Sequence, residues 1–337
     1  MHKKLVNEIR MDLDIIPEGP ILIAKGKSEN ETSNEIHYVK DLNGKAYIPG
    51  SSLKGVIRNY CEKIANTLGV WNCNPLLNND NDKDKPDCSC GKKVEIIKEQ
   101  NDKITIPEIY NKYTCYVCKL FGSTGIASRI HIDDACLIGT SEGYQERTNI
   151  SIDRKTGGVK EGPFKLHTVK PNKFATKIYI RNFELWQIGL LGLALRDLHD
   201  GHIRIGFAKS RGLGKVKANI SNFMITYPFY RLSTDKKRIQ PLSNGQEEKT
   251  LIENGKFYFY GVGSLLGEDG AIYGYSPNDK TEIITTYLPN ADSDWINSRL
   301  TLTDYNTQIK ELLKVCVEQH LIPLANGSGE NQLTQEG

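Results

Sequence analysis

The stretch Tyr47-Ile48-Pro49-Gly50-Ser51-Ser52-Leu53-Lys54-Gly55-Val56-Ile57-Arg58 is the part of the chain that decides its fold. A short apolar strand ends at Pro49, Gly50 gives the turn its freedom, and the paired serines Ser51 and Ser52 can cap the first exposed amides of a helix. Apolar residues then recur at three- and four-residue steps, and Gly69 follows as a stop. The stretch therefore predicts a strand, a tight turn and an amphipathic helix.

Lys54 and Arg58 fall together on one exposed stripe of that helix, close to its positive N-terminus, and this arrangement suits a phosphate. The alternative is that any amphipathic helix carries exposed Lys and Arg residues. The chain has 44 Lys and Arg residues against 41 Asp and Glu residues, a net charge of +3. Nucleic-acid binding would therefore depend on local basic clusters and not on a global field.

A length of 337 residues allows a sizeable core in one large or two modest domains. No window approaches the apolar length of a membrane span, and Met1-His2-Lys3-Lys4 lacks the apolar run of a signal peptide. We therefore expect a cytoplasmic protein with no membrane partner. In that compartment the eight cysteines are better interpreted as thiols or metal ligands than as disulfides.

The opening stretch resembles the signature of the RAMP superfamily, the RNA-binding subunits of CRISPR effector complexes, where it joins a strand to the first helix of a ferredoxin-like, RRM-related fold. Two more segments are similar to that family in the same order. Leu120-Phe121-Gly122 with Ala127-Ser128-Arg129-Ile130 resembles its central segment, and residues 206–214, GFAKSRGLG, resemble its C-terminal glycine-rich loop. The resemblance covers roughly residues 5 to 227 and implies an α+β, ferredoxin-like (RRM-related) RAMP domain.

Apolar periodicity predicts elements that agree with this fold. Alternation at residues 9–15, 177–183 and 215–226 predicts strands, and residues 186–198 predict a second, deeply buried helix. Strand, helix and strand thus occur twice, which is the duplicated plan of a ferredoxin-like domain. We expect a RAMP domain at 1–230 with a cysteine-rich insertion at 71–118, a C-terminal extension at 231–325, and a disordered tail at 326–337.

Basic residues of three segments are expected to hold RNA. The glycine-rich loop places cations among glycines that let backbone amides approach a phosphate, although without the resemblance we would interpret it as a basic surface turn. Residues 147–162 resemble the segment that leads into the family's thumb, a hairpin that wedges between nucleotides of guide and target; the alternative is a surface turn with a charge pair. The predicted RNA-binding residues are Ser51, Ser52, Lys54, Arg58, Arg154, Lys155, Lys209, Arg211 and Lys215.

The insertion carries a candidate zinc site. Cys88-x-Cys90 and Cys115-x-x-Cys118 are pairs of the kind that can each supply two thiolates to one tetrahedral zinc, which would tie down a very polar loop. Cys73 is a fifth candidate for four positions and could replace one of the first pair, while unlinked thiols are the alternative. The cysteines assigned to the core are Cys61, Cys136 and Cys316.

The resemblance also implies a position for catalysis. Many backbone subunits of type III complexes carry a loop aspartate that supports metal-dependent cleavage of target RNA, and the matching position here holds Glu35. A glutamate can bind Mg²⁺ or Mn²⁺ through oxygen, but its additional methylene displaces the carboxylate by roughly an ångström, enough to slow a reaction. Glu31 and His37 flank it and could share the work. The alternative is a solvated acidic loop.

The resemblance therefore implies a guide-RNA (crRNA)-binding backbone subunit of a type III CRISPR antiviral effector complex. Its partners would be guide RNA, target RNA, and the other RAMP and large subunits. Two alternatives stay open: an endoribonuclease that cleaves target RNA or processes the guide precursor, and a zinc-stabilised assembly subunit that makes no RNA contact.

Overall fold

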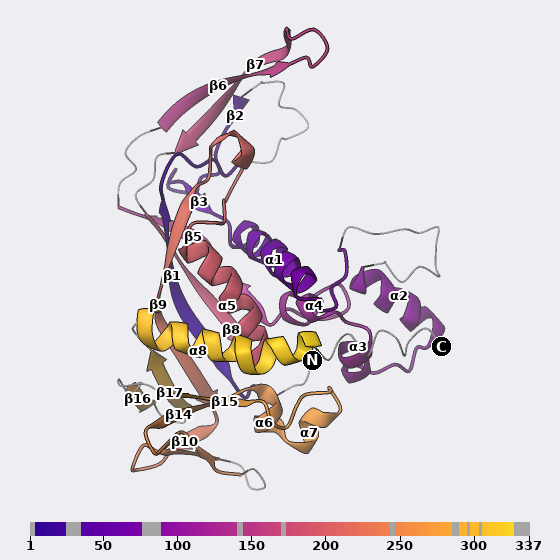
Figure 1. The fold of residues 1–337 in the computed structure, drawn as a ribbon, viewed down its shortest axis with the longest axis vertical. Helices are drawn as coiled ribbons and strands as arrows, with labels where there is room; N and C mark the ends of the chain where they lie inside the picture. Colours follow the sequence, from indigo (N-terminus) through magenta and orange to yellow (C-terminus); the bar gives the residue numbers. More distant parts are fainter. Residues whose placement is uncertain are drawn as a thin grey trace.

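The computed structural model describes residues 4–24, 35–75, 89–139, 144–169, 173–242, 247–284, 290–294, 297–302 and 305–326. It is a mixed α/β structure whose largest sheet is antiparallel, with helices packed against it and smaller sheets towards both ends (Figure 1). The strands of the large sheet, in spatial order, are β16 (Asn290–Asp294), β17 (Asn297–Leu302), β9 (Val216–Pro228), β1 (Glu8–Pro17), β8 (Lys173–Arg181), β5 (Ala135–Ile138) and β3 (Tyr47–Ile48), and β4 (Ile130–Ile132) also pairs with β8.

The centre of this sheet is the strand that alternation predicted. Ile9, Met11, Leu13 and Ile15 of β1 are all buried, while their neighbours are half-exposed. β1 pairs antiparallel with β8 on one side and with β9 on the other. The prediction of strands in these three segments is therefore confirmed.

Two helices connect the central strands. α1 (Gly50–Thr67) lies between β3 and β4 in the chain, and α5 (Leu185–His199) connects β8 to β9. The two helices pack against each other on the same face of the sheet, and residues 53, 57, 61 and 65 of α1 are buried. Both predicted helices are thus confirmed, including the deep burial of α5.

The predicted serine cap of α1 is wrong. Pro49 occupies the N-cap position, and no side chain caps the helix. Instead the Gly50 amide donates to Asp134 Oδ1 at 2.7 Å. A Cβ atom at Gly50 would lie 2.1 Å from the Ile132 carbonyl oxygen, so the glycine is required by the close approach of α1 to the strand beside it.

The cysteine-rich insertion lies to one side of α1 (Figure 1). It folds into α2 (Cys90–Gln100) and α3 (Ile106–Lys112), and α4 (Tyr116–Phe121) follows directly. The expected polar loop at 79–86 lies outside the described residues.

A long hairpin projects from one end of the molecule (Figure 1). It consists of β6 (Tyr144–Ile152) and β7 (Val159–Val169), and β2 (Glu35–Ile36) adds to β7 as a parallel strand. At the tip, the Asp153 carboxylate accepts hydrogen bonds from the amides of Lys155 and Thr156, which holds the turn.

The C-terminal segment docks on the core. Strand β17 extends the large sheet by pairing with β9, and α8 (Lys310–Cys316), between π-helical turns at 305–309 and 317–321, packs on α5. A Cβ at Gly189 of α5 would lie 2.8 Å from the Cys316 carbonyl oxygen, so the helices touch closely. The remaining elements are β10 (Tyr230–Leu232), β11 (Arg238–Pro241), β12 (Lys249–Thr250), β13 (Ile252–Glu253), β14 (Lys256–Tyr260), α6 (Val262–Leu266), α7 (Glu268–Ala271) and β15 (Lys280–Ile284). The predicted tail is described only at residue 326.

Candidate nucleic-acid interface and metal centre

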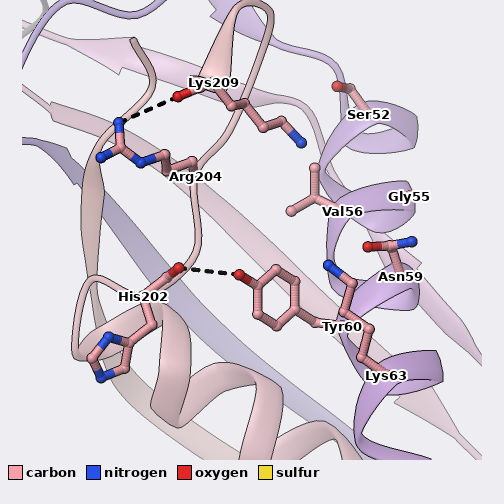
Figure 2. A pocket seen from close by; sticks show the side chains of 9 residues that line it. All are labelled: Ser52, Gly55, Val56, Asn59, Tyr60, Lys63, His202, Arg204 and Lys209. Carbon is pink, nitrogen blue, oxygen red and sulfur yellow. Dashed lines mark hydrogen bonds between the residues drawn. The ribbon is translucent and has the colours of Figure 1, made fainter. Parts of the chain in front are cut away.

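A groove of about 460 Å³ separates helix α1 from the glycine-rich loop (Figure 2). One wall is a single face of α1, since its residues recur at helical spacing, and the other wall is the segment from His202 to Lys209. Two of the three quoted segments, far apart in the sequence, therefore face one another. The lining residues are Ser52, Gly55, Val56, Asn59, Tyr60, Lys63, His202, Arg204 and Lys209.

Cations lie on both walls of this groove. Lys63 projects from α1, with its Nζ 4.9 Å from the centre of the Tyr60 ring, and Lys209 lies on the opposite wall. The Arg204 guanidinium of that wall turns away from α1 and donates to the carbonyl oxygens of Lys209 and Leu213 at 3.5 and 3.4 Å, so it holds the glycine-rich loop. The described lining residues include no carboxylate. The Tyr60 hydroxyl donates to the His202 carbonyl oxygen at 3.0 Å and so joins the two walls. The groove offers positive charge and polar donors, the combination that binds phosphate.

The glycine-rich loop is held in a tight conformation. Lys209–Arg211 form one turn of 3₁₀ helix, and Ala208 before it has a φ of 55°. The left-handed region is unusual for alanine, so Ala208 takes a conformation that glycine favours. Gly214, with a φ of 76°, ends the loop; a Cβ there would lie 2.1 Å from the Ile205 carbonyl oxygen. The loop therefore has a defined backbone conformation that its neighbours hold in place.

The three basic residues predicted near this loop have different surroundings in the structure. Lys209 lines the groove. Arg211 is exposed, and its guanidinium lies 5.5 Å from the centre of the Phe164 ring of β7, which links the loop to the base of the hairpin. Lys215 forms an ion pair with Glu18 at 2.9 Å, which lowers the pKa of that carboxyl.

The hairpin residues Arg154 and Lys155 are exposed at the tip of the β6–β7 turn, at the far end from the large sheet. They are therefore in a position to reach another molecule. In α1, Ser52 lines the groove and Ser51 is exposed beside it.

Lys54 and Arg58 do not form the expected exposed stripe. The ammonium group of Lys54 donates to Ser128 Oγ at 2.7 Å and to the Ile130 carbonyl oxygen at 3.1 Å, and burial, with a smaller effect of Arg58, lowers its pKa. Arg58 is likewise bound to protein groups. Lys54 and Arg58 thus face the central segment that carries Leu120-Phe121-Gly122 and Ala127-Ser128-Arg129, and two of the three segments that resemble the family stabilise each other.

Sequence reasoning missed the residues Asn59, Lys63, His202 and Arg204 of the groove. Helical spacing from Ser52 could have identified Asn59 and Lys63, since both fall on its face of α1. His202 and Arg204 lie opposite α1 only because the tertiary fold brings the two segments together, and the spacing of neighbouring residues does not predict such a long-range contact.

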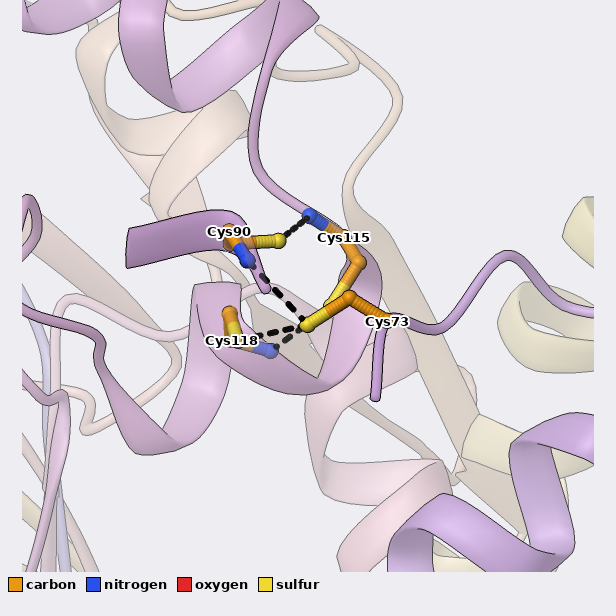
Figure 3. Close-up of side chains that lie close together, drawn as sticks. All are labelled: Cys73, Cys90, Cys115 and Cys118. Carbon is orange, nitrogen blue, oxygen red and sulfur yellow. Dashed lines mark hydrogen bonds between the residues drawn. The ribbon is translucent and has the colours of Figure 1, made fainter. Parts of the chain in front are cut away.

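Four thiols come together between α1, α2 and α4 (Figure 3). The Sγ atoms of Cys73, Cys90, Cys115 and Cys118 all lie within 4.8 Å of one another, and Cys73 lies 3.6 Å from both Cys115 and Cys118. A tetrahedral zinc with Zn–S bonds of about 2.3 Å needs sulfur atoms about 3.8 Å apart. The cluster therefore fits a metal ion such as zinc, with Cys73 as the fourth ligand; Cys88 lies outside the described residues.

The surroundings of the thiols favour thiolates. The amide of Cys115 donates to Cys90 Sγ at 3.2 Å, and the amide of Cys118 donates to Cys115 Sγ at 3.4 Å. Hydrogen bonds among the four thiols lower the pKa of Cys73 and Cys115 and raise the pKa of Cys90 and Cys118, so the thiols share their protons. Backbone amides directed at sulfur are typical of metal-binding cysteines.

The three cysteines outside the cluster differ in burial. Cys61 and Cys316 are buried as expected. Cys136 is exposed, so its assignment to the core is wrong: β5 lies near the edge of the sheet, and this side chain points away from the packed face.

Glu35 lies at the start of β2, where its backbone pairs with Lys165 of β7. Two residues further on, His37 stacks on His167 with ring centres 4.3 Å apart. The backbone of the predicted catalytic position therefore runs along β7, two residues before the His37–His167 stack. Glu31 lies outside the described residues.

Comparison with known proteins adds the family. No curated protein shows significant similarity to the chain. Among the described helices, none combines the length and apolar character needed to cross a bilayer. A family model of the RAMP superfamily matches residues 15–217, more than half of the 337 residues, and the match includes all three quoted segments. The chain therefore belongs to the RAMP superfamily, which implies a CRISPR-associated role in RNA binding.

Proposed function

We propose that the protein is a guide-RNA-binding backbone subunit of a type III CRISPR antiviral effector complex, located in the cytoplasm. The observation that carries this proposal is the cationic groove, whose two walls are the segments that resemble the family's signature and its glycine-rich loop. Its partners would be guide RNA, target RNA, and the other RAMP and large subunits.

The topology supports a ferredoxin-like core for this subunit. The strand order β9-β1-β8-β5, with α1 and α5 on the connections, corresponds to the order 4-1-3-2 of that fold when the four strands are numbered along the chain. We propose the domain boundaries at 1–230 for the RAMP domain and 231–325 for the extension.

In this role the groove would hold the sugar–phosphate backbone of the guide, and base pairing would supply the sequence specificity. Lys63 and Lys209 would contact phosphates, and Arg204 would hold the loop that carries Lys209. Arg154 and Lys155 at the tip of the hairpin would contact the duplex of guide and target.

Binding of single-stranded RNA tests the proposal. Lys209→Glu and Lys63→Glu reverse one charge each in the groove, and Lys314→Glu makes the same change at an exposed position of α8. The groove variants should weaken binding at least about tenfold. The slope of log affinity against log salt concentration should become shallower by about 1, which corresponds to the loss of one phosphate contact. Lys314→Glu should leave both quantities unchanged. If all three variants bind RNA as the wild type does, the groove is not the RNA site, and an assembly subunit without RNA contact is favoured.

Cleavage is a second candidate function, because the backbone of Glu35 pairs with Lys165 of β7, two residues along each strand from the stacked pair His37 and His167. We propose that Glu35 binds Mg²⁺ or Mn²⁺ there and supports hydrolysis of target RNA. The test is a cleavage assay with the assembled complex. Glu35→Ala should abolish metal-dependent cleavage and keep RNA binding. Cleavage that persists in the variant would remove Glu35 from the mechanism, and cleavage of the guide precursor without divalent metal would favour the processing alternative.

A further inference from the structure

A zinc ion bound by four cysteines creates a charge that the protein has to balance. Four thiolates and one Zn²⁺ carry a net charge of roughly −2. Three of the four cysteines are buried and Cys73 is half-buried, so water compensates this charge only in part. A buried charge is costly unless it is paired and hydrogen-bonded. The surroundings of the thiols therefore need a cation or further N–H donors.

Arg58 is a cation in contact with this cluster. Its Nη2 donates to Cys118 Sγ at 3.3 Å, and its Nη1 donates to the carbonyl oxygen of Gly122, the residue that follows α4, at 3.1 Å. Its Nε donates to Glu62 Oε1, one helical turn away, at 2.9 Å. All three nitrogen atoms of the guanidinium are thus engaged, and the planar fork is fixed in one orientation.

The same geometry keeps Arg58 out of the RNA groove. The groove face of α1 includes Asn59 and Lys63, whereas Arg58 belongs to the stripe that faces α4. Only 23% of the Arg58 side chain and 15% of the Glu62 side chain are exposed. A side chain with three protein partners and this little exposure is not available to a phosphate.

We propose that Arg58 is a positioning residue of the metal centre: its guanidinium balances the thiolate charge at Cys118 and ties α4 to α1, and it makes no contact with RNA. Arginine suits this role better than lysine, because its fork binds a sulfur, a carbonyl oxygen and a carboxylate in one plane. The inference concerns the metal centre, so it holds independently of the proposed role in RNA binding.

Zinc release from the full-length, zinc-loaded protein tests this role. A colorimetric chelator in excess would be used to follow release from the wild type, Arg58→Gln and Lys63→Gln. Both substitutions remove one positive charge from α1, but Lys63 faces the groove. We expect Arg58→Gln to lose zinc about 10- to 100-fold more readily, the usual effect of removing a partner of a metal ligand. Lys63→Gln should release zinc at the wild-type rate.

A second measurement separates a direct bond to sulfur from a general loosening of the fold. In the Co²⁺-substituted protein, the loss of an N–H···S bond makes Cys118 a better electron donor, so the sulfur-to-cobalt charge-transfer band should shift to lower energy in Arg58→Gln. It should stay in place in Glu62→Gln, which keeps the guanidinium. RNA affinity of zinc-loaded Arg58→Gln should stay within about twofold of the wild type.

Two results would overturn the proposal. One is zinc release and a cobalt spectrum in Arg58→Gln that match the wild type. The other is a loss of RNA affinity in zinc-loaded Arg58→Gln as large as that in Lys63→Gln and with the same decrease in salt dependence, which would make Arg58 an RNA contact. If neither substitution affects RNA binding while zinc release changes in Arg58→Gln, the role in the metal centre holds and the proposed groove fails.

Discussion

Arg129 should be among the residues on which the stability of this fold depends most. It belongs to the segment Ala127-Ser128-Arg129, and only 3% of it is exposed. Its guanidinium donates to the Asn182 carbonyl oxygen and to the Tyr275 hydroxyl, and it lies 3.7 Å from the Glu184 carboxylate. It also lies 4.7 Å from the centre of the Tyr110 ring. One buried cation thus joins its own segment to three others, around residues 110, 182–184 and 275.

The substitution Arg129→Met keeps much of the side-chain volume and removes the charge. It leaves Glu184 as a buried carboxylate without its cation, and it leaves the Asn182 carbonyl oxygen without this donor. Removal of one member of a buried ion pair costs about 3–5 kcal/mol. At about 2–4 °C per kcal/mol, the melting temperature should fall by roughly 6–20 °C.

The assay is urea and thermal unfolding of the full-length protein, with Arg181→Met as the matched control. Arg181 is also paired with a glutamate, Glu8 at 2.6 Å, but 63% of its side chain is exposed, so its loss should cost at most about 1 kcal/mol. Amide exchange should rise around both Tyr110 and Tyr275 in the Arg129 variant. A change in the free energy of unfolding below about 1 kcal/mol, or one that equals the control, would refute the reasoning.

Three more outcomes follow from the structure. Cys73→Ser should lower the zinc content of the purified protein, whereas Cys88→Ser should keep about one zinc per chain; the opposite result would restore Cys88 as the ligand. Burial, with a smaller effect of Glu184, raises the pKa of Asp279 to about 7. Between pH 4 and pH 7 the folded protein therefore keeps a proton that the unfolded chain loses, so the free energy of unfolding should fall by about 4 kcal/mol over this range. Urea unfolding of Asp279→Asn should lack this pH dependence. Gly214→Ala should destabilise the protein by more than about 2 kcal/mol, because the new Cβ would meet the Ile205 carbonyl oxygen. Gly212→Ala should cost only about 1 kcal/mol, because its Cβ would have open space and only the positive φ is strained. Equal losses of stability in thermal unfolding would contradict this.

The elements of the core could be predicted because local periodicity encodes them. The buried positions of β1 alternate, and those of α1 recur at helical steps, so each pattern can be recognised from neighbours in the sequence alone. The direction in which each polar face of α1 points could not be predicted. Both faces carry cations at helical spacing, and only the tertiary path decides that Arg58 meets Cys118 while Lys63 meets the groove.

The metal centre shows the same limit. The spacing Cys115-x-x-Cys118 indicates a pair of ligands on one short turn, because a single helical N-terminus can present both sulfur atoms. The other two ligands come from distant parts of the chain. Cys73 is at the end of the segment after α1, and its sulfur reaches the cluster because the Tyr116 amide binds the Trp71 carbonyl oxygen at 3.2 Å. That contact has no signature in the sequence.

The groove and the metal centre lie on different faces of one helix, and this arrangement limits how they can influence each other. Charge on the metal centre reaches the groove only weakly, because Arg58 binds Cys118 on the α4 side of α1 and balances it. The position of α1, by contrast, is shared: its buried face packs on α5, and its Arg58 stripe binds α4. We therefore expect the metal to support RNA binding through the position of α1, so that its removal would change affinity without changing the salt dependence, which reports the number of phosphate contacts.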